Sequence, residues 1–543
     1  MVRQAIGRQG SLRILTPEQV TASTKPAAGP ADHDCLGLPP RREEENELLT
    51  QDETSLTVPA FIQGSKKNLI GGKWVDATSG RQIDTVNPAT GQVLCRIAGG
   101  DAADVDLAVS AARRAFEGEW SRWTPHQRRK LILKIHDVIL DNFDELAMIE
   151  TLDMGAPLKR TTGLAEWTSQ VLQFFASQCD AATVATPPNS LPGDFLTLKS
   201  LAPVGVVGGI IPWNGPLIGL WWIFGPALAT GCTAVLKPAE DASLSVLRVA
   251  ELMMEAGVPE GVINVVTGYG ADAGQALAEH RDVDRIAFTG SIGTAQTIVR
   301  ASAGNLKRLQ LELGGKSPDI VFADADLDKA VPGAAMGVFT NSGQVCVAGT
   351  RIFVQRSIHD EFVERMQEFT KTIRVGDGLD PNTQLGPLIS ERQLERVMHY
   401  IDVGGGEGAQ LASGGKRLGG ELASGFFVEP TVFSGASNDM TIAREEIFGP
   451  VASVIPFDDM DDALRLANDT PFGLAGGVWT RSLSTAHKVS QSIKAGTIWV
   501  NCYGVLDPAI GFGGTKMSGY GWKGAKEHVE GYLYPKAVYI NLD

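Results

Sequence analysis

A long stretch without a single charged side chain, residues 200–236, most strongly limits what this chain can fold into. The stretch is long enough for a membrane-spanning helix. Prolines and glycines interrupt it repeatedly, however, and both destabilise the interior of a helix. We therefore predict a strand over 204–210, a turn over 212–214, a buried helix over 217–228 and a strand over 232–236. Such apolar runs are typical of a parallel sheet covered on both faces, so we expect no membrane span.

The alternation continues downstream. Further short apolar strands are predicted over 262–266 and 285–288, and helices over 243–255 and 273–279. Strands that alternate with helices indicate parallel βαβ units and a doubly wound α/β sheet. Ligands of such sheets bind at the carboxyl ends of the strands. Residues that directly follow a strand are therefore the first candidates for a site.

Composition excludes several classes of protein. The 543 residues carry 48 Lys and Arg against 63 Asp and Glu, a net charge of −15, which argues against a nucleic-acid partner. The six cysteines contain no C-x-x-C pair, which argues against a disulfide scaffold and a zinc site. The histidines stand apart from the motifs below, which disfavours a cysteine–histidine or serine–histidine–aspartate hydrolase. We expect no metal.

The two ends of the chain differ from the rest. Residues 1–66 contain a basic start without acids, a Pro-, Ala- and Gly-rich part and a charged run, and are predicted to be a disordered or loosely attached extension. The start is either an organellar transit segment or an ordinary tail. We expect a cytoplasmic protein, with a mitochondrial one as the alternative. The alternating stretch 537–542 is predicted to pair with residues 195–198 and to reach a neighbouring subunit.

Cys346 is the candidate nucleophile. It ends the segment Asn341-Ser-Gly-Gln-Val-Cys346, between an apolar helical stretch (331–339) and a predicted strand (351–354), where glycine and glutamine indicate an open turn. A lone cysteine is more often a buried small apolar residue, as we expect for Cys95, Cys179 and Cys232.

Two polar residues could assist such a nucleophile. Glu312 lies between two leucines before a glycine pair, so burial would raise its pKa and make it a general base, unless a salt bridge holds it. Asn214 lies at a strand–helix turn, where its amide could donate to a developing oxyanion or only cap the helix.

Two further strand ends could hold a dinucleotide. Lys237 and Glu240 could bind ribose hydroxyls, or could belong to a solvated loop. Gly290 and Ser291 open a helix whose N–H groups could face a pyrophosphate, although one glycine is a weak signal.

Taken together, these segments resemble the NAD(P)-dependent aldehyde dehydrogenase superfamily, from about Asn68 to the C-terminus. The markers that carry the resemblance stand in order as Pro212-Trp-Asn214, Lys237-Pro-Ala-Glu240, Phe288-Thr-Gly-Ser291, Leu311-Glu-Leu-Gly-Gly-Lys316, Gly343-Gln-Val-Cys346, Glu445-Glu-Ile-Phe-Gly-Pro450 and Gly513-Gly-Thr-Lys-Met-Ser-Gly519.

The resemblance implies oxidation of an aldehyde to its acid by NAD, with NADP disfavoured. Cys346 would add to the aldehyde, Asn214 and the Cys346 N–H would hold the oxyanion, and Glu312 would activate the water that hydrolyses the thioester. The residues implied to bind the cofactor are Ile210, Pro212, Trp213, Lys237, Glu240, Gly270, Gly290, Ser291, Leu313, Glu446 and Phe448.

The resemblance also implies a pocket and a division into domains. The pocket residues are Gly215, Gly219, Trp222, Val345 and Val347, which suggest a roomy apolar tunnel for a bulky apolar or aromatic aldehyde. The implied fold has a Rossmann-type NAD-binding domain (67–182 and 204–313), an α/β catalytic domain (314–521) and a small β oligomerisation element (183–203 and 522–543) of a homodimer or homotetramer.

Three positions depart from the family pattern. Ala295 stands where a glycine is usual, Gly511 where many relatives have proline, and Trp522-Lys-Gly524 replaces an arginine–glutamate segment. The last two are expected to alter the C-terminal rim of the substrate funnel.

Overall fold

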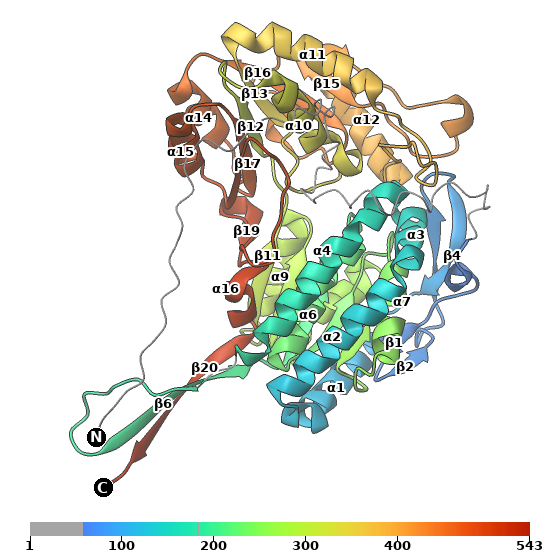
Figure 1. Cartoon of the computed structure of the whole chain (residues 1–543). Coiled ribbons are helices and arrows are strands. Elements are labelled where there is room, and N and C mark those ends of the chain that lie inside the picture. Colours follow the sequence, from blue (N-terminus) through green and yellow to red (C-terminus); the bar gives the residue numbers. More distant parts are fainter. Residues whose placement is uncertain (1–57, 182–183) are drawn as a thin grey trace, which may run out of the picture.

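The computed structural model describes residues 58–181 and 184–543, so the predicted extension up to residue 57, Cys35 included, lies outside the described part. The described residues form four sheets, of eight, seven, three and two strands, and Figure 1 shows their arrangement. Residues 58–66 belong to the packed structure, contrary to prediction. They include the 3₁₀ helix η2 (Ala60–Ile62), Ile62 is 3% exposed, and Lys66 forms a bridge with Ile97.

The first sheet has eight strands. In spatial order they are β19 (Gly519–Tyr520), β11 (Arg308–Glu312), β10 (Arg285–Thr289), β7 (Val206–Ile210), β8 (Thr233–Lys237), β9 (Ile263–Val265), β1 (Asn68–Ile70) and β2 (Lys73–Val75). The five from β11 to β9 are parallel, as predicted, and the outer strands are antiparallel. The chain adds β8 and β9 on one side of β7 and then β10 and β11 on its other side. This strand order is the doubly wound arrangement.

Helices cover both faces of this sheet. They are α1 (Ala102–Glu117), α2 (Pro125–Asp141), α3 (Phe143–Met154), α4 (Leu158–Ser177), α5 (Pro216–Gly219), α6 (Trp221–Thr230), α7 (Leu244–Glu255), α8 (Gln275–Glu279) and α9 (Ile292–Ser302). Successive strand residues enter different cores: Val206 packs in the cluster that contains α1, α8 and α9, and Val207 in the cluster that contains α2, α4 and α6. Both faces are buried, so the strands are apolar throughout.

The uncharged stretch therefore folds as predicted, as β7, a turn, a helical segment and β8, and no helix within the described ranges is long and apolar enough to cross a membrane. The helical segment is divided in two, α5 and α6. Pro226 lies inside α6. Gly231 ends α6 with φ of 88°, in the left-handed region that glycine adopts readily.

The second sheet has seven strands in the order β14 (Gln410–Ser413), β15 (Thr431–Ser434), β16 (Val451–Phe457), β13 (Arg351–Gln355), β12 (Pro318–Val321), β17 (Ala475–Trp479) and β18 (Thr497–Val500). Its helices are α10 (Leu327–Phe339), α11 (His359–Thr372), α12 (Glu391–Gly406), α13 (Thr441–Arg444), α14 (Met460–Asn468) and α15 (Leu483–Ser492). The chain passes from β11 to β12 between the two sheets, so residues 313–317 lie at their junction.

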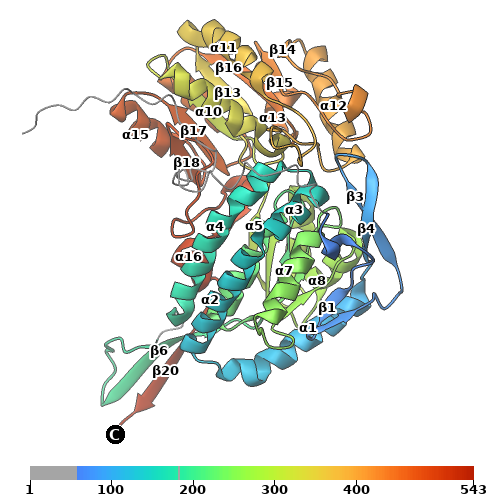
Figure 2. The same ribbon diagram turned by 45° about the vertical axis from the view of Figure 1, so that its right-hand side comes forward.

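The third sheet extends away from the body of the molecule. It pairs β20 (Leu533–Asn541) with β6 (Phe195–Pro203), and β6 with β5 (Val184–Ala185). Figure 2 shows this pair projecting from the same end after rotation. The predicted pairing of 537–542 with 195–198 is confirmed, since Val538 lies opposite Leu198 and Asn541 opposite Phe195.

Two elements depart from the predicted domain division. Strand β19, assigned to the catalytic domain, pairs with β11 of the first sheet. Helix α16 (Ala525–Glu530), assigned to the oligomerisation element, lies against α6. The remaining small sheet, β3 (Gln82–Asn87) with β4 (Gln92–Ala98), is an antiparallel pair beside the first domain.

Candidate active site

Four candidate residues share one edge of the first sheet. Ile210 and Lys237 end the neighbouring strands β7 and β8 and lie opposite each other. Thr289 and Glu312 end β10 and β11 and also lie opposite each other. The carboxyl ends of parallel strands meet at one edge, so separate stretches of sequence supply one site.

The turn before Cys346 has an unusual backbone. Asn341, Ser342 and Gly343 adopt φ of 55°, 58° and 70°, in the left-handed region that costs about 1–2 kcal/mol for a residue with a Cβ. Hydrogen bonds hold the turn: Ser342 Oγ donates to the Gly386 carbonyl at 2.7 Å, and the Ile389 N–H donates to Gln344 Oε1 at 2.9 Å. The turn is thereby fixed by groups far away in sequence.

Asn214 is joined to this turn. Its Nδ2 donates to the Gln344 carbonyl at 2.8 Å, and its own carbonyl accepts from Asn341 Nδ2 at 3.0 Å. Asn214 belongs to the turn between β7 and α5, and no hydrogen bond from its side chain caps a helix. The Asn214 amide is therefore hydrogen-bonded to the residue that lies two positions before Cys346 in the chain.

Cys346 is partly exposed, whereas Cys95, Cys179 and Cys232 are buried, as predicted. Burial raises the pKa of the Cys346 thiol to about 12; Lys523 lowers it, Glu312 and Glu446 raise it further, and the residue's own N–H lowers it. The sulfur thus lies within electrostatic reach of a carboxylate and an ammonium group. It remains a thiol at neutral pH until a base removes its proton.

Glu312 is buried at the end of β11, with 2% of its surface exposed. Neither carboxylate oxygen has a hydrogen-bond partner among the described residues, and no salt bridge holds it. Burial raises its pKa to about 8, while Lys523 and the Gly514 N–H, which faces the carboxylate without full hydrogen-bond geometry, lower it. A carboxyl group with a pKa this close to neutrality suits a general base.

The glycine pair after Glu312 permits close approach. A Cβ on Gly315 would lie 2.5 Å from the Cys346 carbonyl oxygen, and one on Gly314 would lie 2.1 Å from Glu446 Oε2. The Gly315 N–H donates to Glu446 Oε1 at 3.0 Å. Glycine at both positions is therefore required for Glu446 and the turn at residues 341–346, the cysteine turn, to lie this near the end of β11.

Lys237 and Glu240 form an ion pair at 2.9 Å, with the lysine 3% and the glutamate 26% exposed. Ser291 is the N-cap of α9, where its side chain accepts from the Thr294 N–H, and Gly290 donates its N–H to the Glu312 carbonyl at 3.1 Å. Donors and acceptors of this kind at a sheet edge and a helix N-terminus fit a dinucleotide with ribose and phosphate groups.

The other predicted cofactor residues surround this edge. Ile210 and Leu313 are buried in the same cluster. Phe448, with φ of 63°, packs edge-on against Trp213 at 5.3 Å between ring centroids. Pro212 is partly exposed in the turn after β7, and Gly270 is exposed and has free space around its Cα.

The predicted pocket residues lie on two segments: one group is at α5 and α6, and the other is beside Cys346. A Cβ on Gly215 would meet only Ile218, at 3.8 Å, so space exists there. Trp222 is 5% exposed and lies edge-on to Trp167 at 5.4 Å. Gly219 faces Ile211, and Val345 and Val347 flank the partly exposed cysteine.

Comparison with known proteins agrees with this geometry. The model of the Aldehyde dehydrogenase family matches residues 74–538. The chain belongs to the aldehyde dehydrogenase family. It is therefore an oxidoreductase that acts on aldehydes.

The aldehyde dehydrogenase relatives match over most of their length. Aldehyde dehydrogenase 1 of Tanacetum cinerariifolium is 46% identical over 475 residues, 87% of this chain and 94% of that protein. The mitochondrial benzaldehyde dehydrogenase of Antirrhinum majus is 43% identical over 493 residues, 90% and 91% of the two chains. An NAD⁺ complex of an aldehyde dehydrogenase from Bacillus cereus superposes with a TM-score of 0.87 at 43% identity, over 89% and 98% of the chains.

Two departures from the aldehyde dehydrogenase pattern are in contact. A Cβ on Gly511 would lie 3.0 Å from Trp522 Cε3, so the indole takes space beside residue 511. The third departure, Ala295, is 2% exposed and packs with Phe288 and Leu311 between helix and strand.

Sequence reasoning missed several residues that position this aldehyde dehydrogenase site. Gln393 Nε2 donates to the Phe448 carbonyl at 2.8 Å, and an Arg396 Nη donates to the Glu446 carbonyl at 2.7 Å. Tyr503 donates its hydroxyl to the Val347 carbonyl at 2.7 Å. All three act on backbone carbonyls from distant segments, which no local motif reveals.

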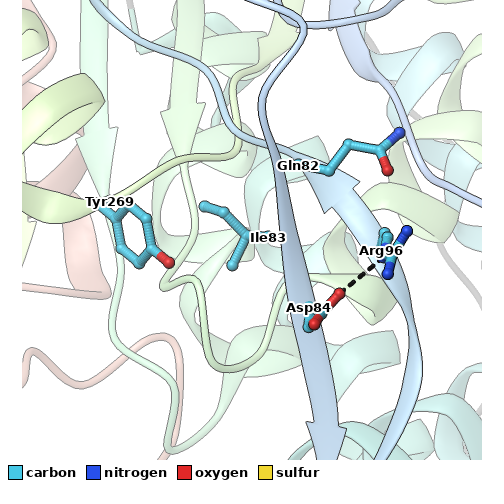
Figure 3. Close-up of a pocket in the computed structure, with 5 residues that line it drawn as sticks. All are labelled: Gln82, Ile83, Asp84, Arg96 and Tyr269. Atoms are coloured by element: carbon cyan, nitrogen blue, oxygen red, sulfur yellow. Dashed lines mark hydrogen bonds and ion pairs between the residues drawn. The ribbon is translucent and has the colours of Figure 1, made fainter.

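A hollow of about 490 Å³ lies elsewhere on the molecule, and Figure 3 shows the residues that line it. It is lined by Gln82, Ile83, Asp84, Arg96 and Tyr269, and Arg96 Nε donates to Asp84 Oδ1 at 2.9 Å. None of the predicted site residues lines it, and its charged side chains pair with each other. We assign it no part in the aldehyde chemistry.

Proposed function

We propose that this aldehyde dehydrogenase oxidises a bulky apolar or aromatic aldehyde to the free acid through a thioester on Cys346. The observation that carries the proposal is the joining of three separate segments at one point: the cysteine turn, the Asn214 amide bonded to that turn, and the unpaired Glu312 carboxylate within electrostatic reach of the sulfur.

The residues would act in order. The Cys346 sulfur adds to the aldehyde carbon as its proton passes to a base. The Asn214 amide and the Cys346 N–H donate to the oxyanion of the thiohemiacetal and stabilise it. The residues at the sheet edge, Lys237, Glu240 and Ser291 among them, would hold NAD, which would supply the acceptor for the hydride of the thiohemiacetal carbon. Glu312 then takes a proton from the water that attacks the resulting thioester. The C–S bond breaks, the free acid leaves, and the proton passes back to the Cys346 sulfur.

Cofactor binding is assigned to the sheet edge. Lys237 and Glu240 would hold the adenosine ribose, Ser291 and Gly290 the pyrophosphate, and Glu446 the nicotinamide side. Glu240 has one carboxylate oxygen bonded to Lys237, and its charge would repel a 2′-phosphate. We expect NAD to be preferred over NADP at least tenfold in kcat/KM, about 1.4 kcal/mol.

Substrate choice rests on the space beside Gly215 and on the absence of Lys and Arg among the five predicted pocket residues. A relative named benzaldehyde dehydrogenase favours the same substrate class. Comparable efficiency with acetaldehyde and a succinate-type semialdehyde, and none with benzaldehyde, would refute the assignment.

A second candidate is transfer of the acyl group to coenzyme A. The retained Glu312 favours hydrolysis, because a base for water is not needed when a thiol accepts the acyl group. Product formation that depends on coenzyme A would reverse this choice.

The proposal is tested by following NADH absorbance with a panel of aldehydes and both nicotinamide cofactors. Cys346→Ala is expected to abolish turnover. Glu312→Gln is expected to release one equivalent of NADH per site and then stall with the acyl group on Cys346, visible by mass spectrometry. Cys179→Ala, at a buried cysteine in a 3₁₀ helix, is the matched control that should keep turnover. An active Cys346→Ala protein would end the proposal.

We further propose a homodimer or homotetramer, assembled through the projecting β6–β20 pair, and a cytoplasmic location, with a mitochondrial one as the alternative. Fluorescent tagging of the full chain at its C-terminus, with and without residues 1–57, tests the location.

A further inference from the structure

Lys523 lies deeper in the molecule than the sequence indicates. Its backbone pairs with Phe512: the Phe512 N–H donates to the Lys523 carbonyl at 2.7 Å, and the Lys523 N–H donates back at 2.7 Å. This bridge brings residue 523, expected only at the rim of the funnel, against the end of the first sheet. Its side chain is partly buried.

The ammonium group is anchored beside the general base. Lys523 Nζ donates to Thr289 Oγ1 at 2.8 Å. Thr289 ends β10 directly opposite Glu312 at the end of β11. The segment that pairs with Lys523 also approaches the Glu312 carboxylate, since a Cβ on Gly513, the residue after Phe512, would lie 3.2 Å from Glu312 Oε1. The hydrogen bond to Thr289 and the pairing of Thr289 with Glu312 therefore place the Lys523 ammonium group near the Glu312 carboxylate.

Lys523, Glu312 and Cys346 influence one another's ionisation. The Lys523 ammonium group is hydrogen-bonded to the neutral Thr289 hydroxyl, and its charge lowers the pKa of both Glu312 and Cys346. Burial lowers the pKa of Lys523 itself, and Glu312 and Cys346 raise it. The lysine thus stabilises the anionic form of the two groups that must lose a proton.

Neighbouring elements supply two more titratable groups. Glu446, after α13, faces Cys346 and opposes its ionisation. His528, on α16, is buried, and burial, with the Arg285 and Lys523 charges, holds its pKa well below the ordinary value. His528 is therefore neutral at pH 7 and does not compete with Lys523 as a cation.

We propose that Lys523 is a positioning residue of the aldehyde dehydrogenase site, an anchored cation that favours the anionic forms of Glu312 and Cys346. The inference deepens the proposed function and rests on the roles given there to these two residues. Lys523 moves no atom of the substrate; it sets the pH at which the nucleophile and the base become active.

The test is the pH dependence of Cys346 alkylation by iodoacetamide, followed by mass spectrometry of the peptide that contains this cysteine. Lys523→Met is expected to slow Cys346 alkylation about tenfold at each pH between about 7 and 9, because the thiolate fraction falls when the nearby positive charge is removed. Lys523→Arg, which keeps the charge, should restore most of the wild-type profile. Lys526→Met, which removes an exposed lysine from α16, is the matched control and should leave the profile unchanged.

Lys523→Gln separates charge from anchoring, because its amide can still donate to Thr289. We expect it to behave like Lys523→Met; it also carries the test if the methionine variant does not fold. Wild-type alkylation profiles in both neutral variants, with circular dichroism of a folded protein, would overturn the inference. Failure of the proposed function is distinguishable, since then the wild-type protein turns over no aldehyde whatever the alkylation profiles are.

Discussion

Glu312 illustrates a conflict between stability and chemistry at the scale of one residue. Its carboxylate is buried and has no hydrogen-bond partner among the described residues, which destabilises the charged form. The folded protein therefore holds the proton up to a pH of about 8, whereas the unfolded chain releases it near 4.5. A carboxyl group with a pKa near neutrality, as the proposed role of general base requires, is obtained at the expense of folding stability above pH 4.5.

The sign of this linkage gives a prediction. Between pH 4.5 and about 8 the unfolded state binds fewer protons at this site, so the wild-type stability falls as pH rises. Glu312→Gln cannot titrate, so its stability relative to wild type should rise across this window, by an amount on the order of a few kcal/mol, and be constant above it. Urea unfolding at several pH values measures the difference. Glu530→Gln, at an exposed position of α16, should show no such trend; a flat difference for Glu312→Gln would contradict the assigned pKa.

The same residue predicts a kinetic profile. Because the base acts deprotonated, the rate of thioester hydrolysis should increase with pH through about 8 and then level off. Pre-steady-state measurements of the acyl-enzyme lifetime would follow this step directly. A hydrolysis rate independent of pH between 6 and 9 would remove Glu312 from the role of base.

At the scale of elements, the turn that holds Cys346 depends on neighbours that force it into an unfavourable backbone. Gly343 has φ of 70°, and a Cβ there would lie 2.0 Å from the Gly449 carbonyl oxygen. Two hydrogen bonds to distant loops offset the strain of the turn: Ser342 donates to the Gly386 carbonyl, and Gln344 accepts from the Ile389 N–H. A rigid turn keeps the sulfur at a fixed place relative to Asn214.

Gly343→Ala is therefore expected to destabilise the protein by more than about 2 kcal/mol and to reduce kcat, since the turn must move to accept the methyl group. The matched control is Gly405→Ala: Gly405 lies in α12, and a Cβ there would meet nothing within 4 Å. That change should stabilise by roughly 0.5–1 kcal/mol and leave kcat unchanged. Thermal unfolding and steady-state kinetics of both variants test the pair; equal effects would show that the turn is not strained.

At the scale of the whole molecule, β6 and β20 project from the body (Figure 1), and the outer edge of β20 pairs with no other strand of the described residues. Tyr539 and Leu542 on this arm are 66% and 61% exposed. An apolar strand with an unpaired edge is an aggregation hazard unless another chain covers it. This arrangement supports assembly through the arm.

Replacement of Tyr539 and Leu542 together by lysine is accordingly expected to lower the molecular mass in solution, measured by light scattering, with the fold retained. Leu483→Lys, at a 74% exposed position of α15, introduces the same kind of charge on the body and should leave the mass unchanged. A doubly substituted protein of wild-type mass would place the interface elsewhere.

Much of this protein follows from local sequence. The alternation of apolar strands and helices determines the parallel sheet, and Pro and Gly in residues 200–236 exclude a single long helix, because backbone geometry limits both choices locally. The family motifs point to Cys346, Glu312 and Asn214 as the proposed nucleophile, base and oxyanion donor, since each stands in a short segment with a characteristic order of residues.

Tertiary structure alone decided how these residues act. The unpaired state of Glu312, the bonding of Asn214 to the cysteine turn and the place of Lys523 beside Thr289 depend on contacts between segments distant in sequence. Burial and nearby charge set the pKa of each group, and both are properties of the packed molecule. The sequence by itself thus determined which groups are available, and only packing decided their protonation and their partners.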